Sequence, residues 1–177
     1  VDVDLGEMLA DAAQVWTDRC LRADIALTAE LPAEPVIVRA DPLRLRQVID
    51  NLAETALRVV PAGGVIVMSA RADGEWGVVE VRDSGPGLAP EDRDVAFEPG
   101  ILHERYRGLR PVGTGLGLAL VGRLASGMAG WARASSAPPR SSTCRNPARR
   151  RAACYWSHPA NCRAPSTPAR SPPVAEA

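Results

Sequence analysis

The sequence contains Asp83-Ser84-Gly85-Pro86-Gly87 and, further along, Gly113-Thr114-Gly115-Leu116-Gly117-Leu118, two glycine-rich turns around which the other features are arranged. Glycine lets the backbone approach a ligand closely, and consecutive N–H groups at a helix N-terminus bind phosphate oxygens. Either turn alone is weak support for a phosphate site, because a glycine-rich loop is more often an ordinary turn. The order of the neighbouring elements decides between the two interpretations.

The first turn follows a predicted β-hairpin. Two β-prone runs, Val65–Ala72 and Trp76–Asp83, flank Asp73-Gly74, a dipeptide typical of tight hairpin turns. We therefore expect two antiparallel strands, with Asp83 at the end of the second.

The segment between the two turns, from Ser84 to Gly115, is dominated by glycine, proline and charged residues. Its pattern predicts only one short helix, around Glu91–Phe97. Because so long a connection inside a compact domain is usually functional, we expect this segment to form a lid over a site.

Three amphipathic helices are predicted, because apolar residues recur at three- and four-residue steps over Leu5–Leu21, after Asp41-Pro42, and over Leu116–Met128. An Asp N-cap followed by Pro at the first helical position is a good start signal for the second helix. The expected buried stripe of the second helix is Leu45, Val48, Ile49, Leu52 and Ala56.

Further strands are expected at Ile25–Leu31, Val36–Arg39 and Trp131–Ser135. The first two are separated by Pro32 and Pro35, which predicts two strands joined by a tight connection.

Composition divides the chain into a body and a tail. Residues 1–137 hold 14 Arg against 20 acidic residues, whereas residues 138–177 hold seven Arg, one acidic residue and eight Pro. With no sustained periodicity, the tail is expected to be disordered. It is interpreted either as a basic segment that attracts acidic partners or, preferably, as sequence without a folded role.

The sequence also excludes several classes of protein. No apolar stretch approaches the roughly 18 residues of a membrane span, and Val1-Asp2-Val3-Asp4 lacks the basic start of a signal peptide, so a soluble, cytoplasmic chain is expected. The cysteine spacings match neither a zinc motif nor a disulfide framework. The four cysteines are Cys20, Cys144, Cys154 and Cys162.

Four short segments in order carry a resemblance to a known family. They are Arg46–Leu52, Asp83–Leu88, Phe97-Glu98-Pro99 and Gly113–Leu118. With them the sequence resembles the ATP-binding (HATPase) domain of histidine kinases, within the GHKL group that includes gyrase B, Hsp90 and MutL. The resemblance spans about residues 1–137.

The resemblance implies a fold as well as a ligand. The implied fold is a two-layer α/β sandwich of the Bergerat type, with a mixed, mostly antiparallel sheet, three helices on one face, and ATP between helices and lid. Residues 1–137 would be the ATP-binding catalytic domain and residues 138–177 its tail. Family members add a final strand, for which Ala152–Trp156 is a weak candidate, so either the sheet lacks a strand or the tail reflects a shifted reading frame.

The resemblance further implies a nucleotide site. Asp83 would accept a hydrogen bond from the adenine amino group, which selects ATP over GTP because guanine presents a carbonyl there. The second glycine-rich turn would wrap the triphosphate. The implied nucleotide-binding positions are Asn51, Asp83, Gly85, Gly87, Leu88, Gly113, Thr114, Gly115, Leu116, Gly117 and Leu118.

The implied catalytic residues are Asn51, Thr55 and Arg58, with Asn51 and Thr55 as ligands of Mg²⁺. Five positions depart from the family, among them Gly100 in place of a common Phe and Ala129 in place of a Gly, and three lie on the metal side. Thr55 replaces a second Asn, Arg58 replaces a Lys, and Val59 replaces an aromatic residue, so the metal side of the site matches less well than the adenine side.

Neither histidine, His103 in the expected lid or His158 in the tail, occupies the upstream helix on which the family carries its phosphoacceptor. A lone loop histidine is expected to be a solvated side chain. We therefore expect an ATP-binding-only subunit of a split two-component kinase. It would act on a histidine-containing phosphotransfer or dimerisation protein that feeds a response regulator, with no role for nucleic acid.

Three alternatives stay open. The chain could be a degenerate ATP-binding regulator without kinase activity, or an excised fragment of a longer kinase. It could also be a related ATPase or serine-directed anti-sigma kinase, which the Phe97-Glu98-Pro99 and Gly113–Leu118 segments disfavour.

Overall fold

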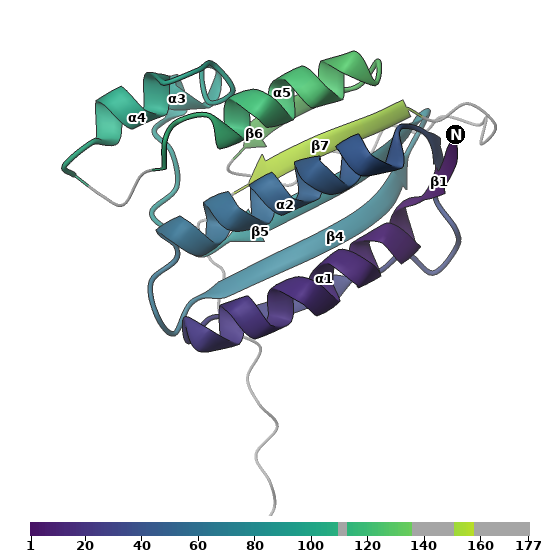
Figure 1. The fold of residues 1–177 in the computed structure, drawn as a ribbon, viewed down its shortest axis with the longest axis horizontal. Helices are drawn as coiled ribbons and strands as arrows, with labels where there is room; N and C mark the ends of the chain where they lie inside the picture. Colours follow the sequence, from purple (N-terminus) through teal and green to yellow (C-terminus); the bar gives the residue numbers. More distant parts are fainter. Residues whose placement is uncertain (110–112, 136–150, 158–177) are drawn as a thin grey trace, which may run out of the picture.

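The computed structural model describes residues 1–109, 113–135 and 151–157, which form a two-layer α/β arrangement (Figure 1). In chain order the elements are β1 (Asp2–Asp4), α1 (Leu5–Arg22), β2 (Ala26–Glu30), β3 (Ile37–Arg39), α2 (Pro42–Val59), β4 (Val65–Asp73), β5 (Trp76–Asp83), α3 (Pro90–Arg93), α4 (Ile101–Tyr106), α5 (Gly117–Gly127), β6 (Trp131–Ser135) and β7 (Arg151–Ser157). Helices α1, α2 and α5 cover one face of a five-stranded sheet whose strand order is β2-β4-β5-β7-β6. The predicted sandwich with three helices on one face is confirmed.

The two long N-terminal helices begin where local chemistry predicts. The carboxylate of Asp4 accepts the backbone N–H of Gly6 at 2.8 Å, at the start of α1. The carboxylate of Asp41 accepts the N–H of Leu43 at 3.0 Å, and Pro42 occupies the first turn of α2. Each cap satisfies a backbone donor that has no partner within its helix.

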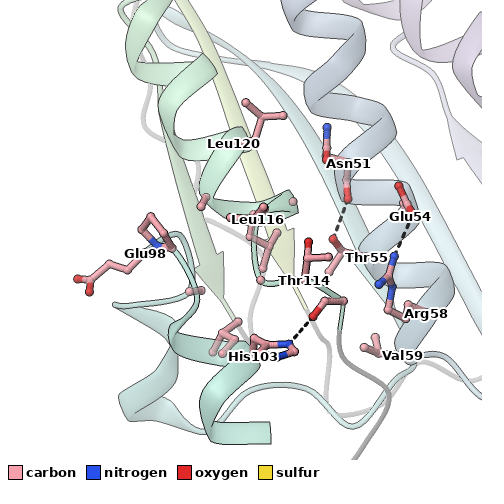
Figure 2. Close-up of a pocket in the computed structure, with 18 of the residues that line it drawn as sticks. Asn51, Glu54, Thr55, Arg58, Val59, Glu98, His103, Thr114, Leu116 and Leu120 are labelled. Carbon is pink, nitrogen blue, oxygen red and sulfur yellow. Dashed lines mark hydrogen bonds and ion pairs between the residues drawn. The ribbon is translucent and has the colours of Figure 1, made fainter. Parts of the chain in front are cut away.

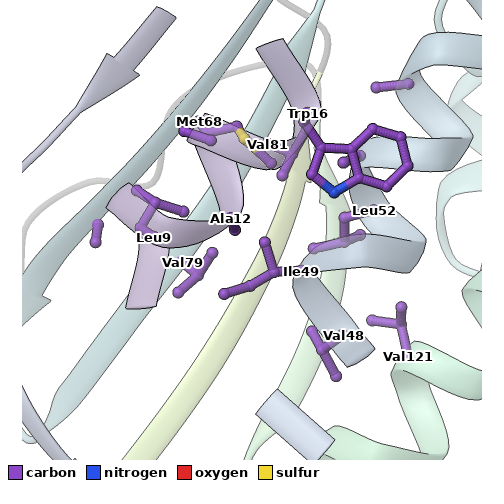
Figure 3. Packing of buried hydrophobic residues seen from close by; sticks show 14 of the residues in the cluster. Leu9, Ala12, Trp16, Val48, Ile49, Leu52, Met68, Val79, Val81 and Val121 are labelled. Carbon is purple, nitrogen blue, oxygen red and sulfur yellow. The ribbon is translucent and has the colours of Figure 1, made fainter. Parts of the chain in front are cut away.

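The core lies between the helices and the sheet (Figure 3). Leu9 of α1, Ile49 and Leu52 of α2, and Met68 of β4 are fully buried there, as are the remaining predicted residues of the α2 stripe. Burying each such aliphatic side chain contributes about 1.5–3 kcal/mol. This packing holds α2 rigidly against the sheet, which fixes one wall of the site described below.

Strands β2 and β3 both form, but their short connection does not make them neighbours. β2 pairs in parallel with β4, whereas β3 pairs antiparallel with β1 in a separate two-stranded sheet. The N–H of Leu5 donates to the carbonyl of Val36 at 3.0 Å, which holds the start of β3 beside the start of α1. The intervening prolines lack the N–H groups that would continue a ladder from β2.

The hairpin β4–β5 confirms the prediction made from Asp73-Gly74, with Ile66 opposite Asp83 in antiparallel register. Beyond it, the lid segment holds two short helices, α3 and α4, where the sequence pattern predicted one. Gly100 precedes α4 with a φ of 78°, a left-handed conformation that glycine adopts without strain. A six-residue helix that buries no side chain completely has too little apolar periodicity to be recognised in the sequence.

The expectation of a disordered tail is corrected at Arg151–Ser157, which form strand β7 between β5 and β6. β7 runs parallel to both neighbours. The five-stranded sheet is mixed, as expected, but it is mostly parallel and not mostly antiparallel, because β4–β5 is the one antiparallel pairing among those described in it. Backbone hydrogen bonds to two neighbours offset the weak apolar pattern that made this segment a poor candidate. The rest of the predicted tail, including Cys144, His158 and Cys162, lies outside the described residues, and a domain boundary at 137 stays a prediction.

Cys20 lies on the inner face of α1 and is 1% exposed, with a free thiol. Burial raises the pKa of the Cys20 thiol, and the nearby positive charge of Arg19 partly opposes that shift. The side chain therefore behaves as a small apolar core residue.

Within the described ranges, none of the helices combines the length and the apolar character that crossing a membrane requires.

Candidate nucleotide-binding site

A cavity of about 640 Å³ lies between α2, α5 and the lid segment (Figure 2). Its volume falls within the range of about 300–1,000 Å³ that is typical of small-molecule sites. The structure brings most of the sequence-predicted residues together here. Those that line the cavity are Asn51, Thr55, Arg58, Leu88, Gly113, Thr114, Gly115, Leu116, Gly117 and Leu118.

The α2 wall of the cavity presents oxygen atoms. Asn51 Nδ2 donates to the carbonyl of Gln47 at 2.7 Å, and Thr55 Oγ1 donates to the carbonyl of Asn51 at 2.7 Å. These bonds use one of the two amide N–H donors of Asn51 and the hydroxyl donor of Thr55, and they leave the amide oxygen of Asn51 and the lone pairs of the Thr55 hydroxyl as acceptors. Both oxygens approach Gly117, since an added Cβ there would lie 3.4 Å from Asn51 Oδ1 and 3.6 Å from Thr55 Oγ1.

This pair of oxygens fits Mg²⁺, a hard cation that takes a few protein oxygens and completes its shell with water and substrate phosphates. Two neutral oxygens from one helix face form a partial ligand set of that kind. The described residues contain no group of three or more His, Cys, Asp or Glu side chains arranged to hold a metal ion.

Arg58, which also lies on α2, adds a positive charge to the lining of the cavity. Its Nη2 atom lies 2.9 Å from Glu54 Oε1, an i,i+4 ion pair on α2. An added Cβ on Gly113 would lie only 2.3 Å from Arg58 Nη1, so the start of the second glycine-rich turn rests directly on the guanidinium. Any side chain at Gly113 would displace Arg58.

The second glycine-rich turn leads into the N-terminus of α5. Gly115 has a φ of 76°, and an added Cβ there would lie 2.9 Å from the Cβ of His103 and 3.0 Å from the Cα of Gly100. No side chain caps the first N–H groups of α5. Because unsatisfied N–H groups and the helix dipole favour negative charge, this end of the cavity suits a phosphate group.

Three predicted positions lie outside the cavity lining: Asp83, Gly85 and Gly87. Asp83 ends β5, is 1% exposed, and accepts the N–H of Gly85 at 2.8 Å. Val59, which does line the cavity, lies against Gly85, because an added Cβ there would be 3.0 Å from Val59 Cγ2. The first glycine-rich turn therefore lies behind Val59.

His103 contributes to the site, contrary to the expectation of a solvated loop side chain. It is half-buried, lines the cavity, and its Nδ1 atom lies 2.6 Å from the carbonyl oxygen of Gly113. Because a carbonyl oxygen only accepts hydrogen bonds, Nδ1 carries the proton. Sequence reasoning also missed other charged residues of the lining, namely Glu54, Glu98 and Arg123.

The family described as "Histidine kinase-, DNA gyrase B-, and HSP90-like ATPase" matches residues 40–149, more than half of the chain. This chain belongs to that family. The match covers α2, the cavity and both glycine-rich turns of this ATPase-family domain, so the resemblance drawn from the sequence is confirmed.

Relatives of this ATPase-family domain are sensor histidine kinases. Sensor protein TorS of Escherichia coli (strain K12) is 39% identical over 132 residues, which cover 74% of this chain and 14% of TorS. The catalytic domain of histidine kinase ThkA has a TM-score of 0.61 at 22% identity, over 72% of this chain and 80% of that domain, and supports the fold. Full-length ShkA, solved in complex with AMPPNP, has a TM-score of 0.55 at 30% identity, over 73% of this chain and 26% of ShkA.

Proposed function

We propose that this domain binds ATP with Mg²⁺ in the cytoplasm and transfers the γ-phosphate to a histidine on a partner protein, as the catalytic subunit of a two-component kinase. The observation that carries the proposal is the cavity, where an uncapped helix N-terminus, a glycine-rich turn, Arg58 and the oxygens of Asn51 and Thr55 converge. The AMPPNP complex of ShkA supports a nucleotide as the occupant. The chain spans only 14% of the length of TorS, and its activity, partner and location are therefore proposals.

Adenine recognition is assigned to Asp83 and the first glycine-rich turn. A carboxylate offers only acceptors, which complements the amino group of adenine and opposes the carbonyl of guanine. Gly85 leaves space beside the carboxylate, since a Cβ added there would lie 2.8 Å from Asp83 Oδ1. Since Val59 lies between this turn and the cavity, we propose that it shifts aside when the base enters, with Leu88 packing against the base.

Triphosphate binding is assigned to the second turn and α2. The backbone N–H groups of Gly113–Gly117 and the N-terminus of α5 would surround the phosphate oxygens, and Arg58 would neutralise charge beside them. Asn51 and Thr55 would hold Mg²⁺, which neutralises the developing charge on the phosphates when bound. Positioning and charge neutralisation are the contributions that phosphoryl transfer requires of a protein.

The phosphoacceptor is assigned to another protein. An imidazole nitrogen of that protein attacks the γ-phosphorus in line, the bond to the bridging oxygen breaks, and ADP leaves. His103 does not follow the pattern of an acceptor on a helix before the ATP-binding domain. A histidine-containing phosphotransfer or dimerisation protein, which then phosphorylates a response regulator, fits this chemistry.

A labelling experiment tests the proposal. The purified chain is mixed with Mg²⁺, γ-labelled ATP and a dimerisation domain carrying an acceptor histidine, and the label on that partner is tested for lability in acid and stability in base. The same partner with its histidine changed to Gln is the control. Acid-labile label on the intact partner alone is expected.

The main alternative is a nucleotide-binding regulator without kinase activity. It is favoured by Thr55, whose short hydroxyl stands where a longer amide is usual. ATP binding without label on any histidine-bearing partner would establish this alternative and overturn the kinase proposal.

A further inference from the structure

His103 links helix α4 to the second glycine-rich turn. Its Nδ1–H donates to the carbonyl of Gly113 at 2.6 Å, and Figure 2 shows this bond at the edge of the cavity beside Thr114. A backbone bond from Gly100 N–H to the carbonyl of Gly115, at 3.3 Å, joins the same helix start to the same turn. The turn is therefore attached to α4 by one backbone bond and one side-chain bond.

The bond to Gly113 fixes the direction of the following amide. A trans peptide unit is planar, so its C=O and N–H point in opposite directions. When His103 holds the Gly113 carbonyl, the N–H of Thr114 must point away from His103. On its other side Gly113 lies against the guanidinium of Arg58, so this peptide is held between groups from α2 and α4.

We propose that His103 is a positioning residue for polyphosphate binding. It orients the Thr114 N–H as a donor to a phosphate oxygen by holding the Gly113 carbonyl, and it does not itself contact the nucleotide. This inference rests on the proposed function, because it assumes that the turn binds the phosphates of ATP.

Three substitutions distinguish the contribution of the Nδ1 atom of His103 from that of its Nε2 atom. In His103→Asn the side-chain amide nitrogen stands near the place of Nδ1, whereas in His103→Gln it reaches toward that of Nε2. His103→Leu removes both ring nitrogens at similar volume. Glu104→Gln, at an exposed neighbour on the same helix, is the matched control.

The measurement is the affinity of each variant for ATP, ADP and adenosine, together with its thermal midpoint. We expect His103→Asn and Glu104→Gln to bind ATP and ADP like the wild type. His103→Leu and His103→Gln should lose about three- to ten-fold, the value of one hydrogen bond. Affinity for adenosine, which has no phosphate, should stay unchanged in all four variants.

The inference is overturned if all four variants bind ATP like the wild type. It is also overturned if His103→Gln retains affinity while His103→Asn loses it, because Nε2 would then be the nitrogen that acts, or if adenosine affinity falls in parallel with that for ATP. If the wild-type chain bound neither ATP nor ADP, the proposed function itself would be wrong, and this inference would fail with it.

Discussion

Asn51 and Thr55 show how single side chains set the chemistry of the α2 wall. Each donates one hydrogen bond to a carbonyl one turn earlier in the helix, at 2.7 Å in both cases, which leaves the amide oxygen of Asn51 and the lone pairs of the Thr55 hydroxyl as possible metal ligands. Thr55 is the weaker of the two as a metal ligand, because a hydroxyl on Cβ extends less far than an amide oxygen. The metal side of this site therefore depends on one short side chain.

Changing Thr55 tests that dependence. Thr55→Asn should raise the affinity for ATP several-fold in the presence of Mg²⁺ and leave affinity in EDTA unchanged, because the longer amide gains reach toward the metal. Thr55→Val, which keeps the shape and removes the hydroxyl, should lower the Mg²⁺-dependent part of binding. Titration with a fluorescent ATP analogue measures both. Equal ATP affinities of Thr55→Asn and the wild type in Mg²⁺ would show that the Thr55 hydroxyl binds the metal as well as an amide would.

Some site residues could be predicted from sequence and others could not. Asn51, Thr55 and Arg58 were assigned through the family resemblance, which short local segments carry, and the glycine-rich turns are visible as local patterns. His103 depends on how α4 folds back onto residue 113, which no local pattern encodes. The position of Asp83 behind Val59 likewise depends on packing between distant segments.

At the scale of elements, the two lid helices are joined by a buried carboxylate. Asp92 of α3 is 5% exposed and accepts hydrogen bonds from Arg105 and from the hydroxyl of Tyr106, both on α4. Buried charges are costly unless they are paired, so this cluster fixes α3 against α4. Because α4 carries His103, this cluster also helps to hold His103 in the lining of the cavity.

Removal of the Asp92 carboxylate should loosen the lid selectively. In Asp92→Ala we expect faster amide hydrogen exchange over α3 and α4, because Arg105 and Tyr106 lose their shared acceptor. Exchange in α1 and α2 should change little. Asp94→Ala, at an exposed neighbouring position, is the control, and equal exchange in the two variants would contradict the role given to Asp92.

The long elements and the short strands β2, β3 and β6 were predictable, whereas α4 was not and β7 had only a weak candidate. α1, α2 and α5 have apolar stripes, and the β4–β5 hairpin has its Asp73-Gly74 turn, so local sequence is sufficient for them. α4 and β7 obtain their stability from neighbours: α4 from the glycine-rich turn and from Asp92, and β7 from pairing with two strands.

At the scale of the whole molecule, β7 completes the sheet. In the order β2-β4-β5-β7-β6 it separates β5 from β6, so β6 pairs with β7 rather than with β5. A mixed α/β sandwich was implied by the family resemblance, and the predicted order of helices and strands agreed with it. The placement of β7 was not, because it depends on long-range pairing from a segment with a weak pattern.

Truncation tests this arrangement. A chain ending at residue 137 should unfold at a lower temperature than the 177-residue chain, because β5 and β6 would lose the hydrogen-bonded neighbour between them. Calorimetry of both chains measures the difference. An unchanged midpoint would show that β7 adds nothing to the fold and would support a domain that ends at 137.

The most direct test of the central claim, an ATP site with Asp83 as its base-selecting residue, is calorimetric titration with ATP and GTP in Mg²⁺. We predict one ATP bound per chain, with GTP at least about ten-fold weaker. In Asp83→Asn the ATP affinity should fall about ten-fold or more, because the amide can still accept from Gly85 N–H but loses the charged acceptor for adenine. The absence of ATP binding, or equal affinities for ATP and GTP that Asp83→Asn leaves unchanged, would contradict it.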